Sequence, residues 1–363
     1  MKILYIIDKP NMYGSERHLL DILRHFSNEE GYHIDLIAFS EGEMLNHVKQ
    51  CNFSVFKINW LVNIFTFTRL YFHIKNISPD VIHCHQPKAL FIGSLLAQML
   101  NIPSVITIHS KAYDHSIIHK NKFRRWLVYS FHKTISFFSE MCANKIIYVN
   151  EKMFDTAAYK NKSLYISNWL PKGYDEGEVR NLKFKKANKL KFVSVGSVTK
   201  AKGYDLLLEF FGCLNDSKIE YSAKIFGGND NAFYSELKQH KSFSYKTEFV
   251  GYSDSLADAY NDADFYVLFS RSETFGLSYL EAMSQGLPII ALDLDELKVL
   301  IPSRNALAPN VGDAYRAFLD MLNPEYYKSI SNDNILRSKE FSYSNRMKQL
   351  ELTYRGLVTS DYI

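Results

Sequence analysis

The sequence has few cysteines and no long apolar run. Its 363 residues include only four cysteines, at positions 51, 84, 142 and 213, and no two of them have the short spacing of a zinc or redox motif. No window reaches the about 18 uninterrupted apolar residues that a membrane span needs. The apolar start of the chain stops at Asp8, too early for a signal sequence. We therefore expect a cytoplasmic protein in a reducing compartment.

The composition is that of an ordinary folded chain. Hydrophobic residues make up 47% and charged residues 23%, which excludes a disordered, collagen-like or coiled-coil protein. At roughly 150 residues per domain, the length predicts two domains. Residues 1–170 carry 19 basic and 13 acidic side chains, whereas residues 171–363 carry 24 and 26. An anionic partner is therefore expected at the first half of the chain.

Two series of alternating strands and helices follow one another along the chain. Apolar runs of strand length predict the strands of the first series at residues 2–7, 33–39, 80–84, 104–108 and 145–149. The second series has predicted strands at residues 191–196, 222–227, 248–251, 265–269 and 288–292. Helical periodicity lies between these runs, and such alternation predicts βα units and parallel sheets.

The polar, glycine-containing segment that starts at Pro171 is the best candidate for a linker between the two series. We expect Rossmann-like α/β domains at residues 1–170 and 171–340, and a last amphipathic helix in 341–363 that crosses back to the first domain. Two such domains form a cleft, and ligands of doubly wound sheets bind beyond the carboxyl ends of the strands. The predicted site therefore faces both domains.

The strongest chemical signal lies in residues 270–283, where a predicted strand ends in a polar turn and a helix begins near Gly276. The N–H groups of a helix start can hold an anion such as a phosphate, and glycine allows a close approach. Glu281, about one and a half turns into the helix, can accept hydrogen bonds from a ribose diol, and Glu273 can meet a sugar ring. By spacing alone, the two glutamates are equally compatible with solvated anions at a helix N-terminus.

This stretch resembles the Glu-x7-Glu signature of retaining glycosyltransferases with the GT-B fold, in particular glycosyltransferase family 4. Other segments match motifs of that family in the same order, namely 13–17, 107–109, 195–203, 249–252, 261–264 and 286–291. The resemblance covers nearly the whole chain. It implies two Rossmann-like domains facing a central cleft, with the acceptor bound by the first domain and a nucleotide-sugar by the second.

The resemblance also implies roles for individual residues. Lys202 stands where the family has a lysine that neutralises the diphosphate leaving group, and His109 where it has a histidine placed against the transferred sugar; with Glu273 they form the expected catalytic set. The expected donor-binding residues are Gly14, Gly196, Ser197, Lys202, Gly251, Tyr252, Thr274, Phe275, Gly276, Leu277 and Glu281. No metal or other cofactor is implied. His83 and His85 have no carboxylate at ligand spacing and are expected to be structural or adjacent to substrate.

Some positions depart from the family pattern. Ser197 stands where the family has an arginine, so diphosphate binding is expected to be weaker unless Lys200 or another base substitutes. Asp295 and Glu296 change the loop on the donor side. These departures favour the alternative of a non-catalytic nucleotide- or carbohydrate-binding protein, and a sugar-nucleotide epimerase of the same fold is another alternative. A dehydrogenase is disfavoured because no Gly-x-Gly-x-x-Gly follows either opening strand.

Residues 119–141 combine basic side chains with an apolar stripe. Five lysines and arginines precede the first acid, Glu140, and apolar residues recur every three or four positions. This pattern is typical of an amphipathic helix on an anionic membrane, or of a helix docked on its own domain with a solvated basic edge. Because family members that act on lipid-linked acceptors contact the inner membrane in this way, we expect peripheral contact with its cytoplasmic face. No nucleic-acid recognition module is visible.

The expected activity follows from the resemblance. It is transfer of a sugar, with retention of configuration, from a nucleotide-sugar to a hydroxyl of a glycan or lipid-linked glycan acceptor. A UDP-sugar is the favoured donor, and bacterial surface polysaccharide or lipopolysaccharide synthesis is the expected setting.

Overall fold

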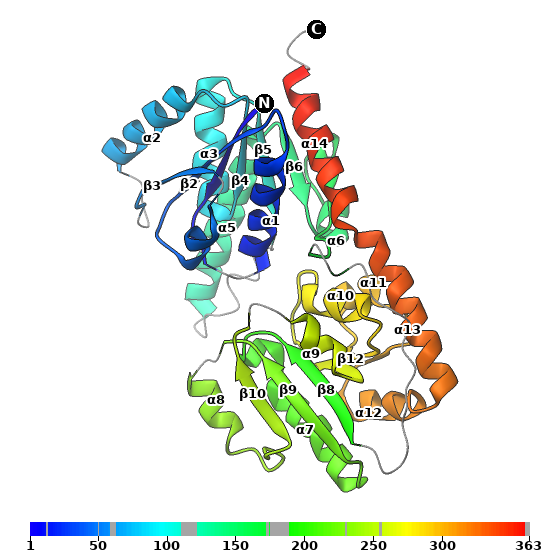
Figure 1. The fold of residues 1–363 in the computed structure, drawn as a ribbon. Coiled ribbons are helices and arrows are strands. Elements are labelled where there is room, and N and C mark those ends of the chain that lie inside the picture. The colour runs from blue at the N-terminus through cyan, green and yellow to red at the C-terminus, as the bar shows by residue number, and fades with distance from the viewer. Residues whose placement is uncertain are drawn as a thin grey trace. The chain divides into compact units, whose positions relative to one another are not determined.

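The chain divides into two compact units, each with its own parallel sheet (Figure 1). The computed structural model describes residues 1–11, 14–49, 51–58, 63–109, 122–171, 174, 189–228, 231–253 and 256–359. Unit 1 comprises Met1–Asn168 and Ser344–Ile363, and unit 2 comprises Trp169–Tyr343.

Unit 1 is built on a seven-stranded sheet in the order β3-β2-β1-β4-β5-β6-β7. The strands are β1 (Lys2–Ile7), β2 (His33–Ala38), β3 (Asn52–Val55), β4 (Val81–His85), β5 (Ser104–Ile108), β6 (Lys145–Tyr148) and β7 (Ser163–Tyr165). All strand pairs are parallel, and the order reverses between β1 and β4. The carboxyl ends of β1 and β4 therefore lie side by side at the point where ligands bind in doubly wound sheets.

Helices cover both faces of the unit 1 sheet. The helices are α1 (Gly14–Asn28), α2 (Ile64–Ile77), α3 (Pro87–Leu100), α5 (Lys122–Cys142), α6 (Glu151–Asp155) and α14 (Tyr343–Thr359). Residues of α2 and α3 share a buried cluster with Ile6 of β1. The neighbouring Tyr5 instead bonds Tyr354 of α14, whose ring contacts Phe26 of α1. Because successive strand residues point to opposite faces, α1 and α14 cover the face opposite to α2 and α3.

Unit 2 repeats this plan with a six-stranded parallel sheet in the order β10-β9-β8-β11-β12-β13. The strands are β8 (Leu190–Val195), β9 (Tyr221–Phe226), β10 (Thr247–Gly251), β11 (Phe265–Leu268), β12 (Ile289–Leu292) and β13 (Ala306–Ala308). The helices are α7 (Tyr204–Asp216), α8 (Asn231–Leu237), α9 (Ala257–Asn261), α10 (Leu277–Ser284), α11 (Asp295–Leu300), α12 (Val311–Asp320) and α13 (Pro324–Ser338). Here the order reverses between β8 and β11.

Local sequence explains where several helices begin. The side chains of Asn63, Asn150, Asn310 and Asn323 each accept a hydrogen bond from a backbone N–H in the first turn of the helix that follows. Such a cap satisfies one of the N–H groups that has no partner inside the helix, and it contributes about 1 kcal/mol.

The predicted fold class, two doubly wound α/β domains, is confirmed by these two sheets. The helix predicted over 119–141 is present as α5, although residues 119–121 lie outside the described residues, as does the proposed linker apart from Pro171 and Tyr174. Several elements were not predicted from the sequence, namely the strands β3, β7 and β13 and the helices α2, α6, α11, α12 and α13. The edge strand β3 is only four residues long, too short for a clear alternation. In α2, by contrast, Phe67, Leu70, Tyr71, Ile74 and Ile77 recur at helical spacing, so the pattern was present and was overlooked.

Two glycines of unit 1 should respond in opposite ways to replacement by alanine. A Cβ on Gly93, in the middle of α3, would overlap Cys84 Sγ on β4, whereas Gly356 in α14 has open space around it. We expect Gly93→Ala to destabilise the protein by about 1–3 kcal/mol through overpacking. Gly356→Ala should stabilise it by up to about 1 kcal/mol through helix propensity. Urea unfolding of both variants measures the change in the free energy of unfolding relative to the wild type. A Gly93→Ala variant as stable as the wild type would contradict the close packing of α3.

Candidate functional site

Most of the predicted donor-binding residues lie where the strand order of unit 2 reverses. Gly196 and Ser197 follow β8, residues 273–276 lie in the connection from the neighbouring strand β11 to α10, and Leu277 begins α10. Lys202 ends a short turn, Lys200–Lys202, that leads into α7. The chain leaves β8 and β11 at the same edge of the parallel sheet, so the fold brings these two loops together.

The Lys202 turn is fixed against the β11 exit by Arg271. The backbone N–H of Arg271 donates to Ala201 O at 2.8 Å, and its guanidinium donates to Lys200 O at 2.7 Å. The same guanidinium forms a bidentate pair with Asp205, both distances being 2.8 Å. The guanidinium of Arg271 is therefore paired with groups of the protein itself. It does not take the place of the arginine that the family pattern has at position 197.

Gly203 allows the turn to approach the strand. Its φ is +66°, a backbone conformation that side chains rarely adopt, and a Cβ there would overlap the carbonyl oxygen of Phe269. Glycine at this position therefore sets how closely Lys202 lies to the loop after β11.

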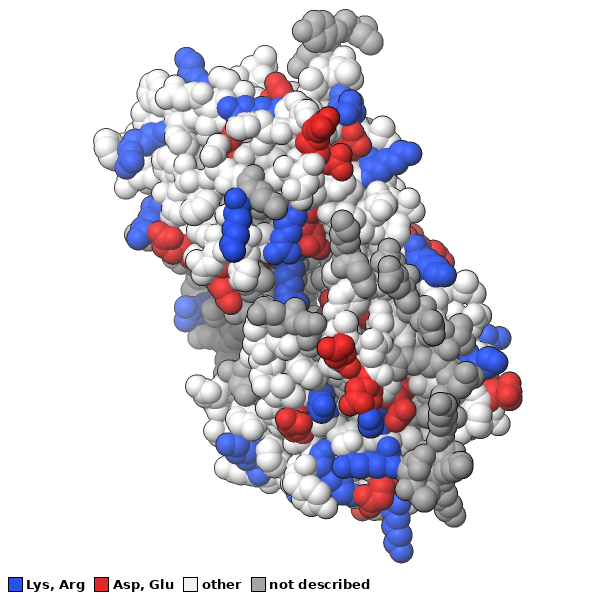
Figure 2. All heavy atoms as spheres, viewed as in Figure 1, with Lys and Arg blue, Asp and Glu red and all other residues white. Residues whose placement is uncertain are grey.

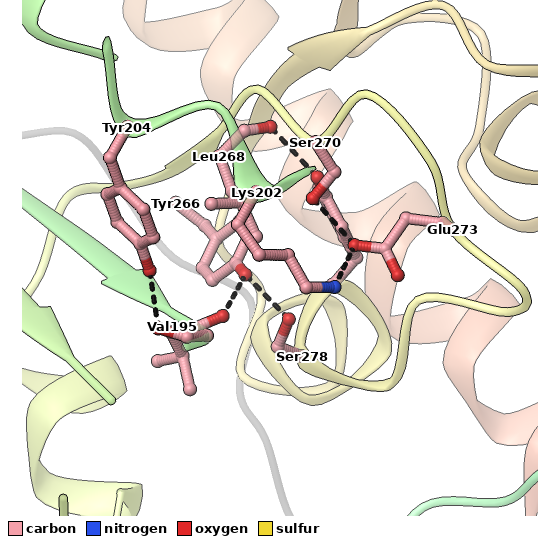
Figure 3. A network of polar contacts seen from close by, with 10 residues as sticks. Val195, Lys202, Tyr204, Tyr266, Leu268, Ser270, Glu273 and Ser278 are labelled. Atoms are coloured by element: carbon pink, nitrogen blue, oxygen red, sulfur yellow. Dashed lines mark hydrogen bonds and ion pairs between the residues drawn. The ribbon is translucent and has the colours of Figure 1, made fainter. Parts of the chain in front are cut away.

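Lys202 and Glu273, which the sequence assigned to different parts of a donor, form an ion pair (Figure 3). Lys202 Nζ lies 2.6 Å from Glu273 Oε1, and Ser270 Oγ donates to the same oxygen at 2.7 Å. The side chain of Lys202 is 26% exposed and that of Glu273 only 8%. The structure thus brings two predicted catalytic residues into direct contact.

Buried tyrosine hydroxyls hold the loops around this pair (Figure 3). The contacts are Tyr204 to Gly196 O at 2.7 Å, Tyr266 to Ser278 Oγ at 2.8 Å and to Val195 O at 3.2 Å, and Tyr279 to Leu268 O at 2.9 Å. Burial raises the pKa of all three phenols, so they remain protonated donors. Sequence reasoning missed them because they come from two helices and a strand with no shared spacing.

Glu281 is oriented by another buried tyrosine. Tyr260 of α9 donates its hydroxyl proton to Glu281 Oε2 at 2.8 Å, and Glu281 is only 7% exposed. Burial, and then the nearby carboxylate of Glu281, raise the pKa of Tyr260 well above its usual value. A fixed carboxylate of this kind suits a ligand that offers hydroxyl donors. No pattern in the sequence links Tyr260 to a residue 21 positions later.

The remaining predicted residues of unit 2 lie around this centre. Gly251 ends β10 and Tyr252 follows it; β10 is two strands from β8 in the sheet order, which corresponds to about 10 Å. Asp295 and Glu296 begin α11, and a Cβ on Gly276 would lie 3.0 Å from Leu297 of that helix. The segment that departs from the family pattern therefore forms a helix packed against the Gly276 turn.

Unit 1 holds a cluster of histidines at the matching edge of its own sheet. His83 and His85 lie on β4, His109 follows β5, and His18 lies on α1. His85 Nδ1 is hydrogen-bonded to His109 Nε2 at 3.2 Å, and the rings of His18 and His109 are 4.9 Å apart. Gly14, the other predicted residue of this unit, begins α1.

His83 joins this cluster to the C-terminal helix. Its Nδ1 is hydrogen-bonded to Tyr354 Oη and its Nε2 to Thr107 Oγ1, both at 2.7 Å. Burial and the neighbouring His109 lower the pKa of His83 to about 3, and burial lowers that of His109 to about 4. Burial and nearby histidines also hold the pKa values of His18 and His85 well below the usual range. The cluster is therefore neutral at physiological pH.

The described residues contain no group of three or more His, Cys, Asp or Glu side chains placed to hold a metal ion. Within the same residues, no helix has the length and apolar character that a bilayer crossing requires.

Helix α5 presents an aromatic and basic surface. Of its 21 residues only Ser139 is buried, while Phe123 and Trp126 are 67% and 59% exposed. Lys122, Arg124, Arg125 and Lys133 lie on the same helix, and Glu140 is its only acid. On the viewed face of the molecule in Figure 2, by contrast, basic and acidic side chains are interspersed.

Two family models match the chain one after the other. The model described as Glycosyltransferase Family 4 matches residues 12–157, and the model described as Glycosyl transferases group 1 matches residues 175–305. Together they account for more than two thirds of the chain.

Individual relatives extend over most of the chain. An uncharacterized glycosyltransferase of Methanocaldococcus jannaschii is 25% identical over 98% of this chain and 99% of its own. The UDP-Gal:alpha-D-GlcNAc-diphosphoundecaprenol alpha-1,3-galactosyltransferase of Escherichia coli is 21% identical over 83% of this chain and 81% of its own. The crystal structure of Anabaena HepE in complex with UDP superposes with a TM-score of 0.79 at 15% identity, covering 98% of this chain and all of that one, which is a similarity of fold.

The neutral histidine cluster predicts a loss of stability in acid. Unfolded histidines take up protons below about pH 6.5, whereas buried His83 stays neutral to about pH 3. The free energy of unfolding therefore has its full value above about pH 6.5. Below that pH it falls by about 1.4 kcal/mol per pH unit for each such histidine. Urea unfolding at pH 7.5 and 5.5 should show this loss, and His83→Gln should reduce it. His33→Gln, at an exposed position of the same sheet, is the control and should retain it. An unchanged pH dependence in His83→Gln would contradict the assignment.

Proposed function

Because the chain belongs to the family 4 glycosyltransferases of the GT-B fold, we propose that it transfers a sugar from a nucleotide-sugar to a hydroxyl of a glycan or lipid-linked glycan. One observation carries this proposal. Lys202, Glu273 and the start of α10 lie together at the point where the strand order of unit 2 reverses. A cation, a carboxylate and helix N–H groups at one strand edge suit a ligand that joins a diphosphate to a sugar.

Each part of the donor has a proposed partner in unit 2. The diphosphate binds the Lys202 ammonium and the N–H groups at the start of α10, where the helix dipole favours anions. The ribose hydroxyls donate to Glu281, which Tyr260 holds in position. The hydroxyls of the transferred sugar donate to Glu273, whose Oε1 is already held by Ser270. In unit 1, the proposed acceptor domain, neutral His109 bonds His85 through Nε2 and can offer Nδ1 to a sugar hydroxyl.

The proposed reaction retains the anomeric configuration. The bond between the anomeric carbon and the phosphate oxygen breaks, and the acceptor oxygen forms a new bond to that carbon on the same face. The proton of the acceptor hydroxyl passes to the departing phosphate oxygen, so the products are the glycoside and a nucleoside diphosphate. Lys202 and the helix start stabilise the charge that develops on the leaving group, which is the role we propose in place of a metal ion.

The choice of donor and acceptor is supported by the relatives. HepE was crystallised with UDP, and the name of the Escherichia coli relative specifies a UDP-sugar and a lipid diphosphate acceptor. A UDP-sugar and a lipid-linked glycan are therefore the proposed substrates, and surface polysaccharide or lipopolysaccharide synthesis is the proposed setting.

Such an acceptor would be reached at a membrane surface, and α5 has the chemistry to bind one. Its exposed Phe123 and Trp126 can enter the headgroup region, and its basic side chains attract anionic lipids. We place the proposed peripheral contact on this helix, which begins at Lys122.

The donor is tested by thermal shift with a panel of UDP-, GDP- and ADP-sugars. A UDP-sugar should raise the melting temperature because it binds only the folded chain. Glu281→Ala should remove most of this shift, and Lys202→Ala should lower turnover by about 100-fold while the protein remains folded. Transfer of a radiolabelled sugar measures turnover. Full activity in both variants would refute the site, and no shift with any nucleotide-sugar would refute the function.

Membrane contact is tested by sedimentation with vesicles. The chain should bind vesicles that contain phosphatidylglycerol and not vesicles of phosphatidylcholine alone. Arg124→Ser combined with Trp126→Ser should weaken binding by about tenfold, since one basic residue near an anionic surface contributes about 1 kcal/mol and the indole adds apolar area. Lys238→Ser combined with Tyr245→Ser removes the same kinds of side chain from exposed positions in unit 2 and should have no effect. Equal loss in both double variants would locate the contact elsewhere.

A further inference from the structure

Two anions compete for the Lys202 ammonium, namely the Glu273 carboxylate and the diphosphate of the proposed donor. The ammonium lies 2.6 Å from Glu273 Oε1, and this is a direct, partly buried ion pair. In the proposed reaction the same ammonium binds the donor diphosphate. A phosphate that arrives at Lys202 therefore meets a cation that is already paired and a carboxylate of its own sign.

We infer that Glu273 stands in for the donor phosphate in the free protein, so that Lys202 exchanges one anion for another when the nucleotide binds. This inference rests on the proposed function. It gives Glu273 a positioning role toward Lys202 in addition to its proposed contact with the sugar.

The surroundings of Glu273 fit such an exchange. Oε1 accepts a hydrogen bond from Ser270 at 2.7 Å as well as from Lys202, so it keeps one donor after the ammonium has moved. Among the described residues no hydrogen bond reaches Oε2, which leaves that oxygen for a ligand (Figure 3). The carboxylate is therefore not left without a partner in the bound state, where a buried and unpaired charge would be costly.

The pair also explains how Lys202 is kept in place without its ligand. Lysine has a long side chain with high rotamer entropy, and at 26% exposure it would otherwise sample many positions. Glu273 lies on the loop that leads into α10, the helix whose start is proposed to bind the same diphosphate. The carboxylate thus holds the ammonium beside the place where the anion is needed, and it weakens the binding of that anion by competition.

The competition is tested by a double-mutant cycle on UDP binding, measured by isothermal titration calorimetry. Glu273→Gln removes the charge but keeps the shape and the Ser270 contact. It should bind UDP about fivefold more tightly than the wild type, which corresponds to the upper range for a partly exposed ion pair. Its transfer rate should nevertheless fall, because the proposed contact with the sugar is weakened.

The second arm of the cycle separates exchange from simple charge repulsion. In a Lys202→Met background, Glu273→Gln should give little or no gain, because no ammonium remains to be released. Glu248→Gln, at an exposed position on β10, removes the same charge from unit 2 and should leave UDP binding unchanged. The melting temperature of each variant, measured without ligand, shows that it is folded.

The outcomes distinguish the inference from the function on which it rests. Wild-type binding of UDP with no gain in Glu273→Gln overturns the exchange and leaves the function standing. An equal gain in the Lys202→Met background also overturns it, since the effect would then be repulsion alone. A wild-type chain that binds neither a nucleoside diphosphate nor pyrophosphate overturns both. If Glu273→Gln does not fold, Glu273→Asp is used, whose shorter side chain should release Lys202 and tighten UDP binding in the same direction.

Discussion

The reversal of strand order is the constraint on which the rest of unit 2 depends. In a parallel sheet every strand ends at the same edge, and connections on either side of the reversal leave in opposite directions. The loops after β8 and β11 are therefore adjacent without a connection crossing between them. The turn that carries Lys202 and the loop that carries Glu273 are 71 residues apart in sequence and still meet within ion-pair distance. Because this contact follows from topology, the site needs only local devices, such as Gly203 and Arg271, to set its final geometry.

Buried hydroxyls supply much of that local order. Tyr204, Tyr260, Tyr266 and Tyr279 are fully buried, and each donates to a group at the carboxyl edge of the sheet. A buried oxygen without a donor costs more than a typical hydrogen bond contributes, so each of these contacts favours one arrangement of the loop it binds. The aromatic rings at the same time fill the core beneath the site.

The sequence predicted the parts of the structure that depend on local pattern. Buried strands such as residues 104–108 and 265–269 are short apolar runs bounded by polar residues, and they appear as β5 and β11. The turn from β11 into α10 was found because glycine and glutamate stand at fixed spacing there. The strand β3 was not found, because it is only four residues long and its two apolar residues, Phe53 and Val55, are too few to establish an alternation. Partners such as Tyr260 and Glu281 were not found either, since their contact is made only when α9 and α10 pack.

The carboxyl edges of the two sheets differ in charge, because the edge in unit 2 carries charged side chains and the edge in unit 1 carries neutral ones. Unit 2 places a charged lysine against a charged glutamate, whereas unit 1 gathers four histidines whose burial keeps them neutral. A neutral imidazole has one donor and one acceptor, which matches the hydroxyl groups of a sugar, while an ammonium matches a phosphate. The two sheet edges therefore offer different chemistry, fixed charge in unit 2 and neutral hydrogen-bonding groups in unit 1. The neutral cluster has a cost in acid, because protonation of His83 would place a charge on a buried imidazole, between Thr107 and the Tyr354 hydroxyl that anchors α14 to the unit 1 sheet.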